Sequence, residues 1–407
     1  MATLRQFFLW AAGLLLIASA QAADIERVYS IPLKTFGYES GGSTYYKYGI
    51  HVGIGGGGPQ LFEFDTGGEG FYASYSASAA WWGNTDVTVS TTPFTKTFGS
   101  QISYEGFVAD APVTFYCGDG SVVLSPAATF KVGQADTITQ YFTQGNATLW
   151  PNAGSQAPVE EHFYGDFGLT LKHGAHGIEN IFAQLTYGNG ITGGYKVSLG
   201  PYGSTSGANI QVGLRAEDLA NPDTIWFEMQ GANPSDPFTG SGFATYSAEI
   251  LSANMTLTLG GDTYTFTDLG INLDTGNPTP GLDFNHADKS LLEPFSEMSG
   301  ADLVQLSNGT ELTLVSTPAG VSVPEVTVFS LTAGNERGRN LVYESERGDG
   351  GATYLNVGAL IFQQYDVVYD LENGLIGLVP VPEPSACALL AAALLFVPAY
   401  LLSQRRS

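Results

Sequence analysis

The alternation of hydrophobic and polar positions along most of the chain predicts a protein built mainly from β-strands. Residues 85–90, 128–132 and 254–259 alternate with a period of two and include β-branched side chains, as half-buried strands do. Glycine-rich stretches punctuate these runs and predict turns. Helical periodicity is confined to two short segments, 177–185 and 287–293. We therefore expect an all-β fold with a few short helices.

Residues 1–22 have the pattern of a secretory signal peptide. Arg5 precedes a short apolar core at 7–20, and Ala20, Gln21 and Ala22 form a small-residue cleavage site. The mature chain is then expected to begin near Ala23. A first transmembrane helix is the less favoured alternative, because the apolar run is short for a membrane span.

The other end of the chain carries a longer apolar segment. Residues 385–402 contain no charge and are followed by Arg405 and Arg406, so this segment is long enough to cross a bilayer. Together with Pro382-Glu383-Pro384, residues 382–407 resemble the PEP-CTERM sorting signal of Gram-negative bacteria. That resemblance implies cleavage by an exosortase and release to the cell surface or exterior. A permanent C-terminal anchor is the less favoured alternative, which stays open because hydropathy alone does not show cleavage.

Composition restricts the partners and the chemistry of the body, residues 23–381. The whole chain has 15 Lys and Arg against 39 Asp and Glu, a formal net charge of −24, which repels nucleic acid and anionic lipid. Without the two terminal segments, Cys117 is the single cysteine, so an intramolecular disulfide is not expected. The body is longer than most single domains, which predicts two lobes.

The tripeptide Asp-Thr-Gly occurs twice and is the sharpest chemical signal in the sequence. It stands at residues 65–67 and 274–276, 209 positions apart, and each copy follows a strand-like apolar run. Such spacing is expected if one half of the molecule repeats the other. Two carboxylates brought together can share a proton and activate a water molecule, which makes Asp65 and Asp274 candidate catalytic residues. The alternative is two unrelated turns, where Asp and Gly are also favoured.

The order of features from about residue 26 to 381 resembles that of the pepsin-like aspartic peptidases. Residues 46–75 resemble the opening strands and first aspartate motif, and 103–106 resemble the flap hairpin, with Tyr104 at its tyrosine. The remaining similar segments are the two apolar-Gly loops at 164–169 and 355–360, the helix and strand at 180–185 and 195–199, and the closing strands at 363–370 and 376–380.

This resemblance implies a bilobed, pepsin-like acid protease fold with an inter-lobe active-site cleft, an N-terminal lobe at 23–199 and a C-terminal lobe at 200–381. It implies an exported, monomeric aspartic endopeptidase that hydrolyses polypeptides with water activated between two aspartates, without cofactor or metal. Signal peptidase and exosortase would process it. The residues whose roles follow from the resemblance are catalytic Asp65 and Asp274, supporting Thr66, Gly67, Thr275 and Gly276, flap Tyr104, and Gly168 and Gly358 of the apolar-Gly loops.

Three departures from the family pattern keep a second function open. Gly68 and Asn277 stand where the family has Ser or Thr hydroxyls that hydrogen-bond the aspartates, and Pro278 stiffens the second turn. A long basic pro-segment is not expected before the first motif, and residues 25–36 are predicted to add a strand between the lobes. A catalytically impaired pepsin-like surface protein that binds peptides or extracellular matrix is therefore the alternative.

Two further patterns predict structure rather than binding. Residues 53–58 fit a GxGxxG pattern, but Pro59 and a strand follow, which favours a hairpin turn over a phosphate site. His173, His176 and Glu179 recur every third position, the kind of set that could hold a metal. The glycines between them argue against a regular helix, so a metal site is not expected.

Overall fold

The computed structural model describes residues 23–381 except 41–42, 142–144, 154, 321–324, 335–339 and 345–351. The predicted signal peptide and sorting signal lie outside the described residues. Among the residues described, no helix has the length and hydropathy needed to cross a membrane.

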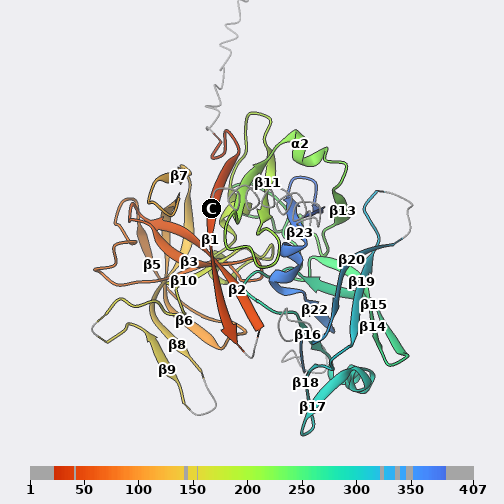
Figure 1. Cartoon of the computed structure of the whole chain (residues 1–407). Coiled ribbons are helices and arrows are strands. Elements are labelled where there is room, and N and C mark those ends of the chain that lie inside the picture. The colour runs from red at the N-terminus through yellow and green to blue at the C-terminus, as the bar shows by residue number, and fades with distance from the viewer. Residues whose placement is uncertain are drawn as a thin grey trace, which may run out of the picture.

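Two sheets hold the strands of the described chain (Figure 1). The first sheet has the order β13 (Ile225–Glu228), β24 (Leu375–Pro380), β23 (Tyr365–Asp370), β11 (Thr192–Ser198), β12 (Asn209–Leu214), β1 (Tyr29–Ser40), β2 (Ser43–Ile54), β3 (Gln60–Asp65), β10 (Gly165–Gly168), β4 (Phe71–Ser74), β8 (Thr129–Gln140), β6 (Ile102–Tyr116) and β5 (Thr88–Thr97), with β7 (Val122–Leu124) on β6 and β9 (Ala147–Trp150) on β8.

The second sheet is made of strands from one continuous part of the sequence. Its order is β17 (Ser296–Ser299), β18 (Asp302–Leu306), β21 (Leu341–Glu344), β16 (Gly281–Phe284), β22 (Tyr354–Asn356), β15 (Asp262–Asn272), β14 (Leu251–Leu259), β19 (Glu311–Ser316) and β20 (Val326–Thr332). The helices described are short: α1 (Ile181–Gln184), α2 (Ala216–Leu219), α3 (Lys289–Leu292), and the 3-10 turns η1 (Ala175–Gly177), η2 (His286–Asp288), η3 (Glu293–Phe295) and η5 (Gly358–Gln363).

The sequence pattern explains these elements locally. Along β14 buried and half-buried residues alternate, as its period of two predicts. The helix predicted at 177–185 is reduced to η1 and the single turn α1, because Gly177 has a positive φ of 72° and ends η1. Asn180 then begins α1, and its side chain accepts hydrogen bonds from the backbone N–H groups of Phe182 and Ala183. The all-β prediction with short helices is confirmed.

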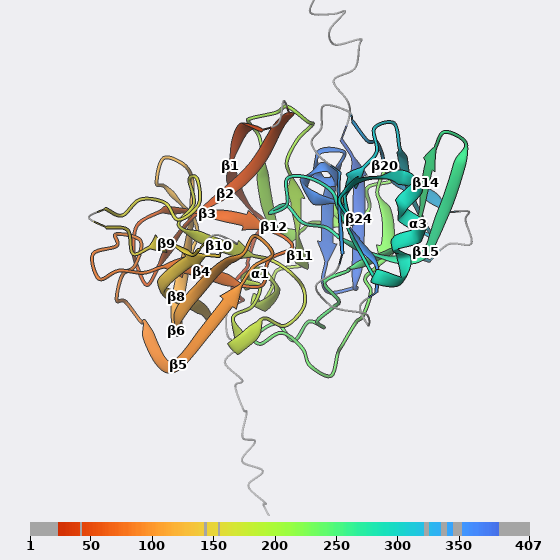
Figure 2. The same cartoon turned by 90° about the horizontal axis from the view of Figure 1, so that it is seen from below.

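Strand β1 lies in the middle of the molecule. It pairs antiparallel with β12 through its first residues and with β2 through the rest. Figure 2 shows β1, β11 and β12 at the centre, with β5, β6 and β8 on one side and β14, β15 and β20 on the other. The prediction that residues 25–36 add a strand is therefore confirmed, and β11 and β23 extend the same sheet.

The same three-strand arrangement occurs twice. Strand β10 lies between β3, to which it is parallel, and β4, to which it is antiparallel. Strand β22 lies in the same way between β15 and β16. Each central strand belongs to a predicted apolar-Gly loop, and each parallel neighbour leads into an Asp-Thr-Gly motif. The sequence repeat is therefore also a structural repeat.

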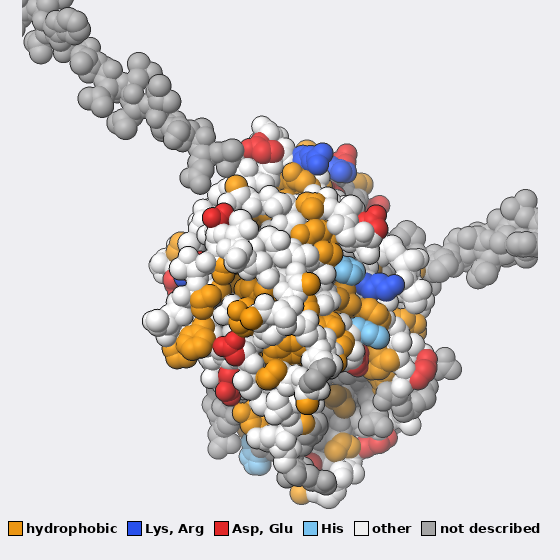
Figure 3. Space-filling view, turned by 90° about the vertical axis from the view of Figure 1, so that its left-hand side faces the viewer, with side chains coloured by type: hydrophobic (Ala, Val, Ile, Leu, Met, Phe, Trp, Pro, Cys, Tyr) orange, Lys and Arg blue, Asp and Glu red, His pale blue; other side chains and the backbone are white. Residues whose placement is uncertain are grey.

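Charged side chains are sparse on the surface, as a content of 13% charged residues requires. Figure 3 shows the face on the left of Figure 1, where Lys and Arg are few and hydrophobic side chains gather in the middle. The predicted hairpin at the glycine-rich stretch 53–58 is confirmed, because β2 pairs antiparallel with β3 across it.

Candidate active site

The two Asp-Thr-Gly motifs meet face to face. Asp65 is the last residue of β3, and Asp274 follows β15 after Leu273. Their side chains share a hydrogen bond. A Cβ atom on Gly67 would lie 2.4 Å from Cγ of Asp274, and one on Gly276 would lie 2.5 Å from Cγ of Asp65. Each glycine therefore leaves the space that the opposite carboxyl occupies.

The threonines of the motifs hold the two loops together. The Thr66 hydroxyl donates to the carbonyl of Leu273 at 2.8 Å and accepts from the backbone N–H of Thr275 at 3.0 Å. The Thr275 hydroxyl donates to the carbonyl of Phe64 at 2.7 Å and accepts from the N–H of Thr66 at 3.0 Å. Both threonines are buried. These four hydrogen bonds fix the separation of the two aspartates, each of which directly precedes one of the threonines.

Backbone N–H groups orient each carboxyl. Oδ1 of Asp65 accepts from the N–H groups of Gly67 and Gly68, both at 2.8 Å. Oδ1 of Asp274 accepts from Gly276 at 2.9 Å and Asn277 at 3.1 Å. Gly68 and Asn277 thus contact the aspartates through the backbone, although neither brings a hydroxyl. Both aspartates are partly exposed, which leaves them open to a reactant.

The electrostatic environment keeps a proton in this site. Burial, followed by the charges of Asp274 and Asp166, raises the pKa of Asp65 well above its usual range. Two carboxyls in contact cannot both be ionised without strong repulsion, so Asp65 retains its proton to a higher pH than an isolated aspartate would. One carboxyl of the pair can then act as a base while the other acts as an acid.

Two residues that the sequence did not single out reach the aspartates from the apolar-Gly loops. Asn356 donates from Nδ2 to Oδ2 of Asp274 at 2.6 Å, while its Oδ1 accepts from the N–H of Gly358 at 2.9 Å. Asp166 stands at the matching position of the first loop and shares a side-chain hydrogen bond with Asp65. The sequence signal is a polar residue two positions before each loop glycine.

The side chain of Asn277 is engaged through its oxygen. Its Oδ1 accepts from the backbone N–H of Thr279 at 3.3 Å, within its own turn. The amide that reaches Asp274 comes from Asn356 instead. A donor on the second aspartate is therefore present but comes from another loop.

The loop glycines lie directly beneath the motif turns. A Cβ atom on Gly168 would come within 2.6 Å of the carbonyl oxygens of Gly68 and Gly70. Gly358 has a positive φ of 62°, and its Cβ would lie 2.7 Å from the carbonyl oxygen of Asn277. Only glycine allows this close approach of the two chain segments.

Tyr104 lies on the β5–β6 hairpin, opposite Lys96 of β5 and Ile138 of β8. Its side chain is 3% exposed, and its ring contacts Phe98 and Tyr72 with centroid distances of 5.5 and 6.2 Å. Burial and then the charge of Asp166 raise the pKa of the Tyr104 hydroxyl. Tyr104 thus lies on a hairpin as predicted, packed against its own hairpin, and its role as the flap tyrosine stays a prediction.

The side chain of His173 makes polar contacts with two acidic residues. Nδ1 of His173 contacts Glu179, and Nε2 lies 2.9 Å from the carbonyl oxygen and 3.1 Å from Oδ1 of Asp236. His176 belongs to η1 and has a positive φ of 62°. Within the described residues, no group of three or more His, Cys, Asp or Glu is placed to hold a metal ion.

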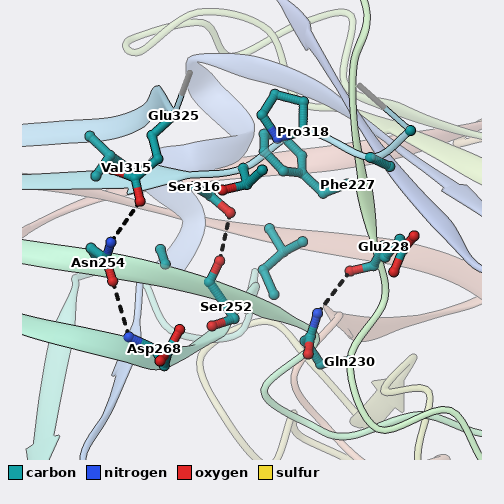
Figure 4. Close-up of a pocket in the computed structure, with 15 residues that line it drawn as sticks. Phe227, Glu228, Gln230, Ser252, Asn254, Asp268, Val315, Ser316, Pro318 and Glu325 are labelled. Atoms are coloured by element: carbon teal, nitrogen blue, oxygen red, sulfur yellow. Dashed lines mark hydrogen bonds between the residues drawn. The ribbon is translucent and has the colours of Figure 1, made fainter. Parts of the chain in front are cut away.

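A hollow of about 440 Å³ lies away from the aspartates (Figure 4). Its walls come from β13, β14, β15 and β19, and they include Phe227, Asn254, Asp268 and Glu325. Asn254 accepts a hydrogen bond from the N–H of Asp268 at 3.1 Å, and the Ser316 hydroxyl donates to the carbonyl of Ser252 at 2.6 Å. These contacts tie neighbouring strands together, and none of the predicted site residues lines this hollow.

The sequence matches no known family profile and no curated protein sequence. Solved structures do match the fold. An aspartic proteinase from Irpex lacteus is similar with a TM-score of 0.52 and 16% sequence identity, covering 87% of this chain and 98% of that one. Basic 7S globulin from soybean is similar with a TM-score of 0.49 and 11% identity, covering 87% of this chain and 96% of that one. The first similarity shows that this chain has the pepsin-like aspartic proteinase fold.

Proposed function

We propose that this chain is an aspartic endopeptidase that hydrolyses peptide bonds with water held between Asp65 and Asp274. The observation that carries the proposal is the hydrogen bond between these two carboxyls, supported on both sides by backbone N–H groups. The fold contributes a scaffold shared with proteinases, whereas the function is argued from the site itself.

The geometry supports a two-step hydrolysis. The ionised carboxyl of the pair takes a proton from the water as the water oxygen attacks the peptide carbonyl carbon. The protonated carboxyl gives its proton to the carbonyl oxygen, which forms a tetrahedral diol. A proton then moves from the pair to the amide nitrogen, and one hydroxyl of the diol returns a proton to the pair. The C–N bond breaks, and a carboxylic acid and an amine leave. The pair ends with one proton, as it began.

Asn-substituted variants test this mechanism on a denatured protein substrate between about pH 3 and 6, where one of two coupled carboxyls holds a proton. Asp65→Asn and Asp274→Asn are each expected to lower kcat by at least about 10³-fold, because each removes half of the acid–base pair. Asp110→Asn is the matched control, since Asp110 forms a half-exposed ion pair with Lys131.

Peptide binding without cleavage at any pH would support the second function, a catalytically impaired surface protein. The absence of a side-chain hydroxyl at Gly68 and Asn277 is the observation that favours it. Full activity of Asp65→Asn would reject the aspartic mechanism outright.

Export and processing complete the proposal. Signal peptidase would release the chain near Ala23, and an exosortase would cut near residues 382–384. Mass spectrometry of protein from culture medium and membranes should find both new ends on the external form. An intact 385–402 segment in the membrane fraction would instead support a permanent anchor.

A further inference from the structure

We propose that Asp166 is a positioning residue of the catalytic pair: its carboxyl carries a proton and donates it to Oδ2 of Asp65. Asp166 would thereby replace the hydroxyl that pepsin-like peptidases have directly after the first Asp-Thr-Gly. The inference rests on the proposed function, and it assigns a third carboxyl to the same site.

The space around Gly68 is the first step of the argument. A Cβ atom at Gly68 would lie 2.6 Å from Oδ2 of Asp65 and 2.9 Å from Oδ1 of Asp166. The two carboxyl oxygens therefore occupy the volume that a Ser or Thr side chain would need. The Asp166 carboxyl thus lies where the side chain of a Ser or Thr at position 68 would otherwise lie.

The second half of the molecule shows what this loop position does. Asn356 and Asp166 each stand two residues before the glycine of their loop, on strands β22 and β10. Asn356 donates to Oδ2 of Asp274 at 2.6 Å. The structural repeat places Asp166 in the same relation to Asp65, where a donor requires that Asp166 be protonated.

The surroundings of Asp166 favour the protonated form. The residue is 6% exposed, and no donor among the described residues reaches its Oδ1. Oδ1 of Asp65, by contrast, accepts two backbone N–H bonds. Burial and the charge of Glu63 raise the pKa of Asp166 well above its usual range, and they outweigh the contact with Asp65, which by itself lowers it.

The titratable groups near Asp166 come from several elements, and most are acidic. They are Asp65 and Glu63 of β3, Tyr72 of β4, Tyr104 of β6, Glu160, and Asp274 after β15. The cation of this region, Lys47, pairs with Glu63 at 3.1 Å and Glu160 at 2.6 Å. Asp166 is therefore left beside carboxyls, and two protons are shared over Asp166, Asp65 and Asp274 in the active form.

The pH dependence of kcat in two variants tests the donor role. Asp166→Leu removes the hydrogen bond that stabilises the ionised pair, so kcat should fall about 10- to 100-fold and both limbs of the pH profile should move to higher pH. Asp166→Asn keeps a donor, so kcat should fall only about threefold and the limbs should stay in place. KM should change little in both, because Asp166 acts through Asp65.

A double variant provides the rescue. Gly68→Ser alone places its side chain against two carboxyl oxygens and should lose activity. Combined with Asp166→Ala, which frees space for the new side chain and for the Asp65 carboxyl, the new hydroxyl can donate to Asp65. The kcat should then rise above that of Asp166→Ala alone, and the limbs should return toward lower pH. Asp110→Asn should leave kcat and the pH profile unchanged.

Carboxyl ¹³C NMR of the full-length wild type gives a reading that does not depend on catalysis. The Asp166 signal, identified by its loss in Asp166→Asn, should report a protonated carboxyl through the pH range of activity. An ionised Asp166, or pH limbs that move downward in Asp166→Asn, would overturn the proposal. Equal loss of kcat in both Asp166 variants with unmoved limbs would also overturn it. Failure of the proposed function is distinct, since the wild type would then cleave nothing.

Discussion

Thr66 and Thr275 each hold the backbone of the other. Each hydroxyl accepts the N–H of the opposite threonine at 3.0 Å and donates to the carbonyl of a residue that precedes the opposite motif. Both threonines are buried in the seam where the two motifs meet. The same two residues therefore stabilise the centre of the fold and set the positions of Asp65 and Asp274.

Loss of either hydroxyl should destabilise the protein. Thr275→Val leaves the N–H of Thr66 and the carbonyl of Phe64 buried without partners, which costs about 2–4 kcal/mol of unfolding free energy. The double variant with Thr66→Val should cost less than the sum, because the two residues share one network. Urea unfolding measures both. Thr256→Val is the control, since that hydroxyl pairs with Thr265 at an exposed site and should change stability by less than about 0.5 kcal/mol. Additive losses would contradict a shared network.

Alanine at the motif glycines should abolish activity while the fold persists. Gly67→Ala and Gly276→Ala each force a Cβ atom into the opposite carboxyl, at 2.4 and 2.5 Å. A displacement of the carboxyls by about 1 Å should lower kcat by about 10²-fold or more. Circular dichroism checks folding. Gly99→Ala, where nothing lies within 4 Å of the added atom, should be as active as the wild type. Active Gly67→Ala protein would mean that the carboxyls need not meet.

The raised pKa of Asp65 makes stability depend on pH. In the unfolded chain Asp65 loses its proton near its usual pKa of about 3.9, whereas the folded site retains it to higher pH. The folded state thus binds more protons, so the unfolding free energy is highest in acid and falls as pH rises from about 4 to the folded pKa. Thermal unfolding over a pH series measures this slope.

Asp65→Asn should flatten that slope, because the amide does not titrate. The same substitution at Asp110, in a half-exposed ion pair, should leave the slope as it is. Stability that rises over this pH range, with the slope unchanged in Asp65→Asn, would show that the carboxyls are not held protonated.

Loss of the buried cation Lys47 should lower the unfolding free energy far more than loss of a half-exposed one. Lys47 is 8% exposed and contacts both Glu63 and Glu160. Lys47→Met leaves these carboxyls without their cation and should cost about 3–5 kcal/mol of unfolding free energy. Lys131→Met, which breaks a half-exposed pair with Asp110, should cost less than about 1 kcal/mol. Similar losses in both variants would mean that burial is not what makes the Lys47 contacts strong.

Local patterns in the sequence predicted the strands, the glycine-rich hairpin and the added strand between the halves, because alternation and turn glycines act over a few residues. The short helix was over-extended, since Gly177 takes a left-handed conformation that periodicity does not register. The place of Tyr104 on a hairpin followed from the sequence, whereas its packing against Phe98 and Tyr72 depends on strands that meet only in the folded chain.

The contacts of Asp166 and Asn356 depend on tertiary structure even more strongly. Each lies in a segment that is otherwise apolar. A role for Asp166 can be inferred only from the folded structure, where Gly68, 98 positions earlier in the sequence, leaves space for its carboxyl. The absence of a hydroxyl at position 68 is visible in the sequence. The carboxyl that fills the vacated space is visible only in three dimensions.

Strand β1 has hydrogen-bonded neighbours on both sides, β12 along its first residues and β2 along the rest. A shortened protein that begins after residue 40 would lack β1, and the edges of β12 and β2 that pair with it would have no hydrogen-bond partners. Such a fragment should self-associate into insoluble material, whereas a tag placed ahead of residue 23 should be harmless. Expression trials of shortened versions would therefore do best to keep the whole of this strand.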